Sequence, residues 1–172
     1  LLASLMLPGI AFSLYFKSGD HGPLLLSAAT SFVIGATLFF SLSKQEQNVR
    51  KREGYLIVAV SWLLMTLFGM LPFLLSGATS SIPDAIFETV SGLTTTGATI
   101  LTDIEVVPKG ILFWRSMIQW IGGLGIIVLT VAIFPLLGIG GIELFVAESP
   151  GPTSDKLHPR IQETAKRLWY VY

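Results

Sequence analysis

The chain has 172 residues, of which 52% are hydrophobic and only 13% are charged, about half the charged fraction of a typical soluble domain. Eleven basic residues balance eleven acidic ones, so the net charge gives no reason to expect a nucleic-acid partner. Cysteine is absent, which excludes disulfides and thiolate metal sites. A composition this apolar needs lipid, and we expect an all-α polytopic membrane protein in contact with the bilayer.

Two uncharged stretches open the chain, over residues 1–16 and 24–43. Crossing the roughly 30 Å hydrocarbon layer takes about 20 helical residues. The second stretch is long enough, whereas the first is slightly short and is expected to be a helix cut off at its start. The sequence therefore predicts two N-terminal transmembrane helices over residues 1–43, the first of them truncated.

Two further stretches predict another pair of spans. Residues 54–83 are uncharged, but Pro72 and a run of small polar residues after it limit the predicted helix to about 55–75. Residues 116–142 predict the next span. An aromatic and basic group precedes it, and we expect Arg115 to extend its guanidinium toward the outer interface.

The basic residues are distributed unevenly between the two sides of these spans. Four lie in the linker 44–54 and four in the tail after residue 142, against only Lys17, Lys109 and Arg115 elsewhere. The positive-inside rule therefore places the linker and the tail 143–168 in the cytoplasm. The segment 143–172 is expected to lead into a next membrane helix, because it ends on aromatic residues typical of the interface.

A short helix is predicted on the outer side, over residues 82–92. Ser81 can cap it, Pro83 suits its first turn, Asp84 complements its positive end and Gly92 can stop it. Eleven residues at about 1.5 Å each give roughly 16 Å, half of the bilayer. Such a helix enters the membrane without crossing it.

Three threonines and a glycine follow this helix, in the loop 94–99. Non-helical backbone at membrane depth is tolerated only where protein buries it or where it lines a watery cavity. Its carbonyl oxygens can replace the water shell of a monovalent cation, as in potassium-channel filters. The negative end of one short helix contributes only about 1 kcal/mol at 8 Å, so this mechanism needs four loops around one axis. The alternative is a capped turn in an extracellular loop.

The chain resembles the Trk/Ktr/HKT potassium-uptake family, most closely its bacterial TrkH type. The likeness covers nearly the whole chain and is most specific in residues 87–99 (FETVSGLTTTGAT), 113–126 (FWRSMIQWIGGLGI) and 147–152 (AESPGP). It implies four helix–loop–helix repeats in one polypeptide, preceded in TrkH types by two extra helices. In that frame residues 1–43 are the extra pair and residues 55–142 the first repeat, with a re-entrant pore loop of a potassium-channel-like fold.

The resemblance assigns potassium, the transported ion, to the backbone carbonyls of four residues: Thr95, Thr96, Gly97 and Ala98. It favours potassium over sodium because sodium-permeable relatives often have serine where Gly97 stands. Supporting roles fall to Thr94, to Glu88, which either bonds loop amides behind the filter or contacts the ion, and to Asp103, which can concentrate cations at the mouth. No catalytic or cofactor-binding residue is expected.

The resemblance also implies partners and a location. The partners are the remaining three repeats, a second identical subunit and a cytosolic nucleotide-binding regulatory subunit, and the location is the bacterial inner membrane. Within the family, a sodium-permeable transporter or a transporter that couples potassium to sodium or protons stays an alternative.

Two other classes are weighed against an ion pathway. A non-conducting membrane anchor or assembly subunit would share the spans but not the transport function. A membrane enzyme needs paired acids, a histidine or a nucleophile with its base at membrane depth, and the predicted spans contain none. We therefore expect a protein that is not an enzyme. Gly122 and Gly123 indicate close helix packing or a flexible inner helix.

Overall fold

The computed structural model describes residues 2–42, 51–128, 167 and 170–171. Within these ranges the chain is helical, with no strand, as predicted. The larger part of the predicted linker 44–54, the second half of the predicted span 116–142 and nearly all of the segment 143–172 lie outside the described residues. The helices are α1 (Leu2–Phe16), α2 (His21–Leu42), α3 (Lys51–Gly69), α4 (Leu71–Leu75), α5 (Ile82–Leu93) and α6 (Lys109–Val128).

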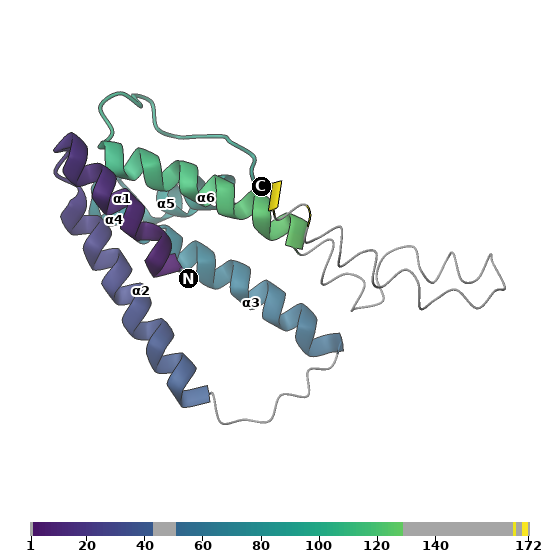
Figure 1. Ribbon diagram of the computed structural model, residues 1–172. Helices are drawn as coiled ribbons and strands as arrows, with labels where there is room; N and C mark the ends of the chain where they lie inside the picture. The colour runs from purple at the N-terminus through teal and green to yellow at the C-terminus, as the bar shows by residue number, and fades with distance from the viewer. Residues whose placement is uncertain (1, 43–50, 129–166, 168–169, 172) are drawn as a thin grey trace.

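The first two helices form a hairpin, in which α2 turns back beside α1 (Figure 1). The turn between them contains two residues in the left-handed region, Lys17 at φ 52° and Gly19 at φ 81°. Left-handed residues reverse the chain within a few positions, and glycine adopts this conformation without steric cost. The hairpin packs on α6 through α1, so it is joined to the rest of the helices along that face.

The predicted helix 55–75 is observed as two helices. It begins earlier, at Lys51, and is interrupted at Met70 between α3 and α4. The cause is Pro72, which has no N–H to donate to the carbonyl four residues before it. After the interruption, the amides of Phe73 and Leu74 both bond to the carbonyl of Met70, at 3.1 and 3.2 Å.

The core lies where α1, α2, α4, α5 and α6 meet. Its largest side chain is Trp114 of α6, which is fully buried and donates its indole N–H to the carbonyl of Gly69 at 3.0 Å. Phe73 of α4 is fully buried in the same cluster. The indole bond satisfies a carbonyl at the end of α3, next to the interruption before α4.

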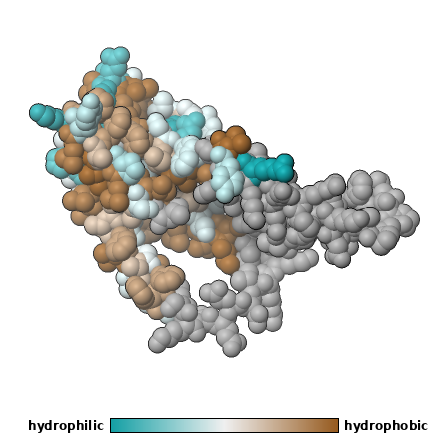
Figure 2. All heavy atoms as spheres, in the orientation of Figure 1, coloured by the Kyte–Doolittle hydropathy of each residue, from teal (hydrophilic) through white to brown (hydrophobic). Residues whose placement is uncertain are grey.

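Two helical segments of the described chain, His21–Ser41 and Leu56–Leu75, are long and apolar enough to cross a membrane. Many large hydrophobic side chains on these helices are exposed, among them Phe32, Phe39 and Leu63. Figure 2 shows hydrophobic residues over most of the described face turned to the viewer. An apolar surface of this extent is consistent with a membrane protein, whose helices contact lipid or further helices.

Candidate functional site

The site is built on α5, the short helix predicted at 82–92. Its N-cap is Ser81, whose extended backbone places Oγ 3.3 Å from the amide of Asp84, and Pro83 occupies the first turn. The helix does not stop at Gly92 but continues to Leu93. Gly92 stays helical because its missing side chain makes room for α6, since a Cβ there would lie 2.9 Å from Cγ2 of Ile118.

The chain reverses directly after α5. The amides of Thr94 and Thr95 bond to the carbonyls of Val90 and Gly92, at 2.8 and 2.9 Å, and close the helix end. Thr95 (φ 57°) and Gly97 (φ 77°) are both left-handed. A β-branched residue is uncommon in this region, and at Thr95 it turns the chain.

After this turn the loop runs back along α6 toward the helix start, as Figure 1 shows. A cavity of about 370 Å³ lies between the loop residues Gly97, Thr99 and Ile104 and the α6 residues Leu112 and Arg115, together with Glu88 of α5. A second cavity, of about 540 Å³, joins residues 76–80 before α5 to residues 100–103 and 106–108 before α6. The residues just before α5 and those just before α6 therefore lie close together, so the chain between them returns to where it began.

Ser91 ties three consecutive loop residues to α5. Its carbonyl accepts from the amides of Thr96 and Gly97, at 3.0 and 3.3 Å, and its hydroxyl donates to the carbonyl of Ala98 at 2.5 Å. No donor among the described residues reaches the carbonyl oxygens of residues 94–97. The four residues expected to bind the ion thus divide in two. No donor among the described residues reaches the Thr95, Thr96 and Gly97 carbonyls, whereas the Ala98 carbonyl accepts from the Ser91 hydroxyl and, at 3.5 Å, from Nη2 of Arg115.

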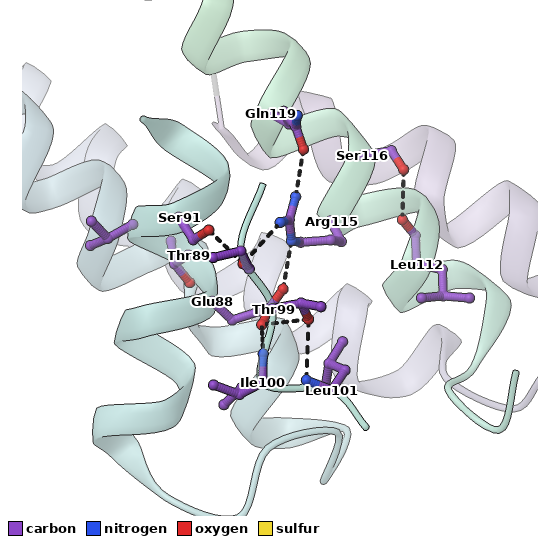
Figure 3. A network of polar contacts seen from close by, with 12 residues as sticks. Glu88, Thr89, Ser91, Thr99, Ile100, Leu101, Leu112, Arg115, Ser116 and Gln119 are labelled. Carbon is purple, nitrogen blue, oxygen red and sulfur yellow. Dashed lines mark hydrogen bonds and ion pairs between the residues drawn. The ribbon is translucent and has the colours of Figure 1, made fainter. Parts of the chain in front are cut away.

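Glu88 lies behind the loop and is fully buried (Figure 3). One carboxylate oxygen accepts from Nε of Arg115 at 2.6 Å. The other accepts from the hydroxyl of Thr99 at 3.0 Å and the amide of Ile100 at 3.1 Å. Glu88 was expected either to bond loop amides or to contact the ion. Its described contacts include a bond from a loop amide, that of Ile100.

The expectation that Arg115 extends to the outer interface is wrong. Its side chain is 12% exposed and turns inward, with Nη1 donating to Oε1 of Gln119 at 2.8 Å and Nη2 lying 3.5 Å from the Ala98 carbonyl (Figure 3). The physical reason is the buried carboxylate of Glu88, because an ion leaves water at much lower cost when an opposite charge and hydrogen bonds meet it.

Asp103 and Gly122, also discussed in the sequence analysis, take no part in the described hydrogen bonds of Glu88 and Arg115. Asp103 is exposed and lines the 540 Å³ cavity together with Asp84, away from the turn at residues 95–97. Gly122 packs against the end of α5, where a Cβ would overlap the carbonyl of Leu93, so it serves close helix packing. No described residue lies within 4 Å of such a Cβ on Gly125.

Asp20 is the second buried carboxylate of the described chain and was not predicted from the sequence. It accepts hydrogen bonds from the hydroxyls of Ser13 and Ser18 and from the amide of Ile111, the last at 2.7 Å. Burial raises the pKa of Asp20, but these bonds and one from its own amide outweigh it and hold the pKa below the ordinary 3.8. The sequence signal that could have indicated it is the position of this acid between Gly19 and the start of α2.

These helices and their apolar surface are consistent with the class of helical membrane proteins. A family model described as "TrkH: Cation transport protein" matches residues 24–172. The chain therefore belongs to the TrkH cation transport family, which confirms the family inferred from residues 87–99.

The relatives found among known proteins carry names from one transport system. The chain is 47% identical to the Trk system potassium uptake protein TrkH of Halomonas elongata, over 97% of its length, and 44% identical to that of Escherichia coli K12, over 98%. It is 38% identical to the Trk system potassium uptake protein TrkG of Escherichia coli K12, over 97%. In each case it spans 35% of the relative's length.

Proposed function

We propose that the protein takes up potassium ions and that its loop 94–99 supplies one quarter of a carbonyl-lined selectivity filter. The observation that carries this proposal is the exposed turn after α5, in which consecutive carbonyl oxygens accept no hydrogen bond from the described residues. Consecutive oxygens of this kind are the ligands that replace the hydration shell of potassium. The family and the names of its relatives support the same ion.

The ligand set we propose differs slightly from the one that the resemblance implies. Thr95, Thr96 and Gly97 keep their place as ligands through their carbonyls, and Thr94 supports them. The Ala98 carbonyl is engaged with the Ser91 hydroxyl, so we place it behind the ligands rather than among them. Glu88 holds the loop from behind, and Asp103 attracts cations at the outer mouth.

Four loops are needed to bind a dehydrated cation, because the negative end of one short helix contributes only about 1 kcal/mol. The relatives are about three times longer than this chain, which leaves room for further repeats. We therefore propose residues 55–142 as the first of four helix–loop–helix repeats, with 82–93 as pore helix, and residues 1–43 as an additional helix pair.

The wider assembly follows from the same family frame. We place the protein in the bacterial inner membrane, with residues 44–54 and 143–168 in the cytoplasm, where their basic residues favour that side. A second identical subunit and a cytosolic nucleotide-binding regulatory subunit complete the proposed system. "Trk system" in the names of the relatives supports a multi-component arrangement. Transport of this kind involves no covalent chemistry, so the protein is proposed not to be an enzyme.

The decisive experiment is Gly97→Asp in the protein expressed in full length, in cells that lack other potassium-uptake systems. Gly97 sits at φ 77° in the loop, and a carboxylate there would obstruct the ion path and bind the cation too tightly. We expect potassium uptake to be lost while the protein still accumulates in the membrane.

The matched control is Gly77→Asp, the same change at a left-handed glycine (φ 73°) that lies in the loop before α5 and has open space around it. We expect uptake close to the unchanged protein. Normal uptake in Gly97→Asp would overturn the filter assignment and favour a non-conducting membrane anchor. Gly97→Ser tests the sodium-permeable alternative, since we expect it to raise sodium uptake relative to potassium.

A further inference from the structure

We propose that Ser91 is a positioning residue that decides which loop carbonyls face the ion, and that its hydroxyl sets selectivity by withdrawing the Ala98 carbonyl. This inference rests on the proposed function, because it assigns a role within that filter. Ser91 lies in the last turn of α5, 5% exposed, between the helix and the returning loop.

The backbone carbonyl of Ser91 fixes the direction of two peptide groups. A trans peptide is planar, and its N–H and C=O point in opposite directions. The amides of Thr96 and Gly97 both point to the Ser91 oxygen. The carbonyls in the same two peptide groups, those of Thr95 and Thr96, must therefore point away from α5, where they can face an ion.

The side chain of Ser91 has the opposite effect on the carbonyl of Ala98, because it turns that oxygen toward α5. Its hydroxyl donates to the oxygen of Ala98 at 2.5 Å and draws that oxygen toward α5, where Nη2 of Arg115 also lies 3.5 Å away. One residue thus directs two carbonyls outward and holds a third inward. The number of oxygens offered to the ion, and so the ion that fits, depends on this side chain.

The neighbouring hydroxyls do not share this function. Thr89 donates to the carbonyl of Ala85 at 2.7 Å and Thr94 to that of Val90 at 2.8 Å, and both acceptors belong to α5 itself. Among the described hydroxyls of the helix and its cap, Ser91 is the one that donates to a loop carbonyl beyond residue 97. This contrast supplies a matched control on the same helix.

The test is Ser91→Ala in the full-length protein, with the ratio of potassium to sodium uptake as the readout. Without the hydroxyl the Ala98 carbonyl loses its main partner and is released toward the ion path. We expect the ratio to fall about fivefold, the change in population that one lost hydrogen bond typically produces. A role only in folding would lower the amount of protein in the membrane and leave this ratio unchanged.

Thr89→Val is the control, because it removes a buried hydroxyl whose acceptor already has its helical partner. We expect the uptake ratio to stay as in the unchanged protein. Ser91→Cys keeps nearly the same volume with a weaker donor, and we expect an intermediate ratio. It also replaces Ser91→Ala as the test if that variant does not accumulate in the membrane.

An uptake ratio that is unchanged in whichever of these Ser91 variants accumulates would overturn the proposal. If potassium uptake is lost in Gly97→Asp and the ratio is unchanged in the Ser91 variants, the filter stands and only the role of Ser91 fails. If uptake survives Gly97→Asp, the proposed function itself fails.

Discussion

Two buried carboxylates, Glu88 and Asp20, hold different segments against the same helix, α6, in different ways. Each accepts from a backbone amide distant in sequence, Glu88 from Ile100 and Asp20 from Ile111. Glu88 is neutralised by the guanidinium of Arg115, whereas Asp20 is surrounded by serine hydroxyls. A charged partner offsets much of the free-energy cost of burying a carboxylate, but its removal leaves a large penalty. Several hydroxyls offset the same cost through separate hydrogen bonds, so the loss of any one of them costs less.

The largest expected effect comes from breaking the charged pair. Arg115→Met leaves the Glu88 carboxylate buried without its counter-charge, and we expect the free energy of unfolding to fall by about 3–5 kcal/mol. Denaturant unfolding of the purified full-length protein in detergent measures this loss. Potassium uptake should fall as well, because the loop loses the support behind residues 98–100.

Removing both charges tests whether the loss of stability comes from the unpaired carboxylate. Glu88→Gln combined with Arg115→Met leaves no unpaired charge, and we expect the double variant to recover much of the lost stability. If the double variant is as unstable as Arg115→Met alone, the penalty does not come from the buried carboxylate. The amide of the glutamine keeps one oxygen as an acceptor for the Ile100 amide.

A smaller effect is expected from two glycines of α6, Gly122 beside the end of α5 and Gly110 beside Asp20. A Cβ on Gly122 meets the backbone carbonyl of Leu93, which cannot move without moving α5, whereas a Cβ on Gly110 meets side-chain atoms of Asp20, Leu24 and Ser13. We expect Gly122→Ala to cost about 3 kcal/mol and Gly110→Ala about 1 kcal/mol, the upper and lower parts of the usual range for overpacking.

The control for both glycine variants is Gly125→Ala. No described residue lies within 4 Å of an added Cβ on Gly125, and alanine stabilises a helix interior relative to glycine by up to about 1 kcal/mol. Thermal unfolding of the three variants side by side measures the order. Equal stability of Gly122→Ala and Gly125→Ala would contradict the close contact of α5 with α6.

An effect as small as that of Gly110→Ala is expected from Asp20→Asn. The amide keeps one acceptor oxygen, so we expect a loss of about 1 kcal/mol at neutral pH. Because the pKa of Asp20 is lowered in the folded state, its contribution is complete above the unfolded value near 3.8 and disappears as the pH falls through the lowered pKa. The stability gap between the variant and the unchanged protein should therefore begin to narrow as the pH falls below about 3.8.

The exposed acid Asp103 gives the control for this pH dependence. Asp103→Asn removes a carboxylate that no described donor meets, so we expect unfolding to match the unchanged protein at each pH. A gap for Asp20→Asn that stays constant from pH 7 to pH 3 would contradict the lowered pKa. The measurement is unfolding at a series of pH values.

The start of α5 could be predicted from neighbouring residues, whereas contacts between segments distant in the sequence could not. Ser81, Pro83 and Asp84 act within one helical turn, so the helix start could be read from neighbouring residues. The partner of Arg115 lies 27 positions away on another helix. Which group Arg115 pairs with depends on how α5 and α6 pack. The prediction that it extends to the interface rested only on what arginines near a membrane surface generally do.

The glycines show the same limit. Gly92 was expected to stop the helix, and instead it makes room for Ile118 of α6. A glycine at a helix end and a glycine at a helix contact look alike in sequence, because both are defined by what surrounds them. The loop itself could be predicted from its threonines and Gly97, whereas the inward direction of the Ala98 carbonyl depends on Ser91, seven positions earlier.

The position of Ile111 and Arg115 on one helix has a mechanical consequence. They are four residues apart, about 6 Å along the axis, so the contacts to the α1–α2 turn and to Glu88 fix the axial register of α6 at two points. Sliding α6 by a single turn would separate both contacts together. A force applied to the α1–α2 turn thus reaches the support of the loop through one turn of rigid helix, and the two N-terminal helices act as a brace against which the loop is aligned.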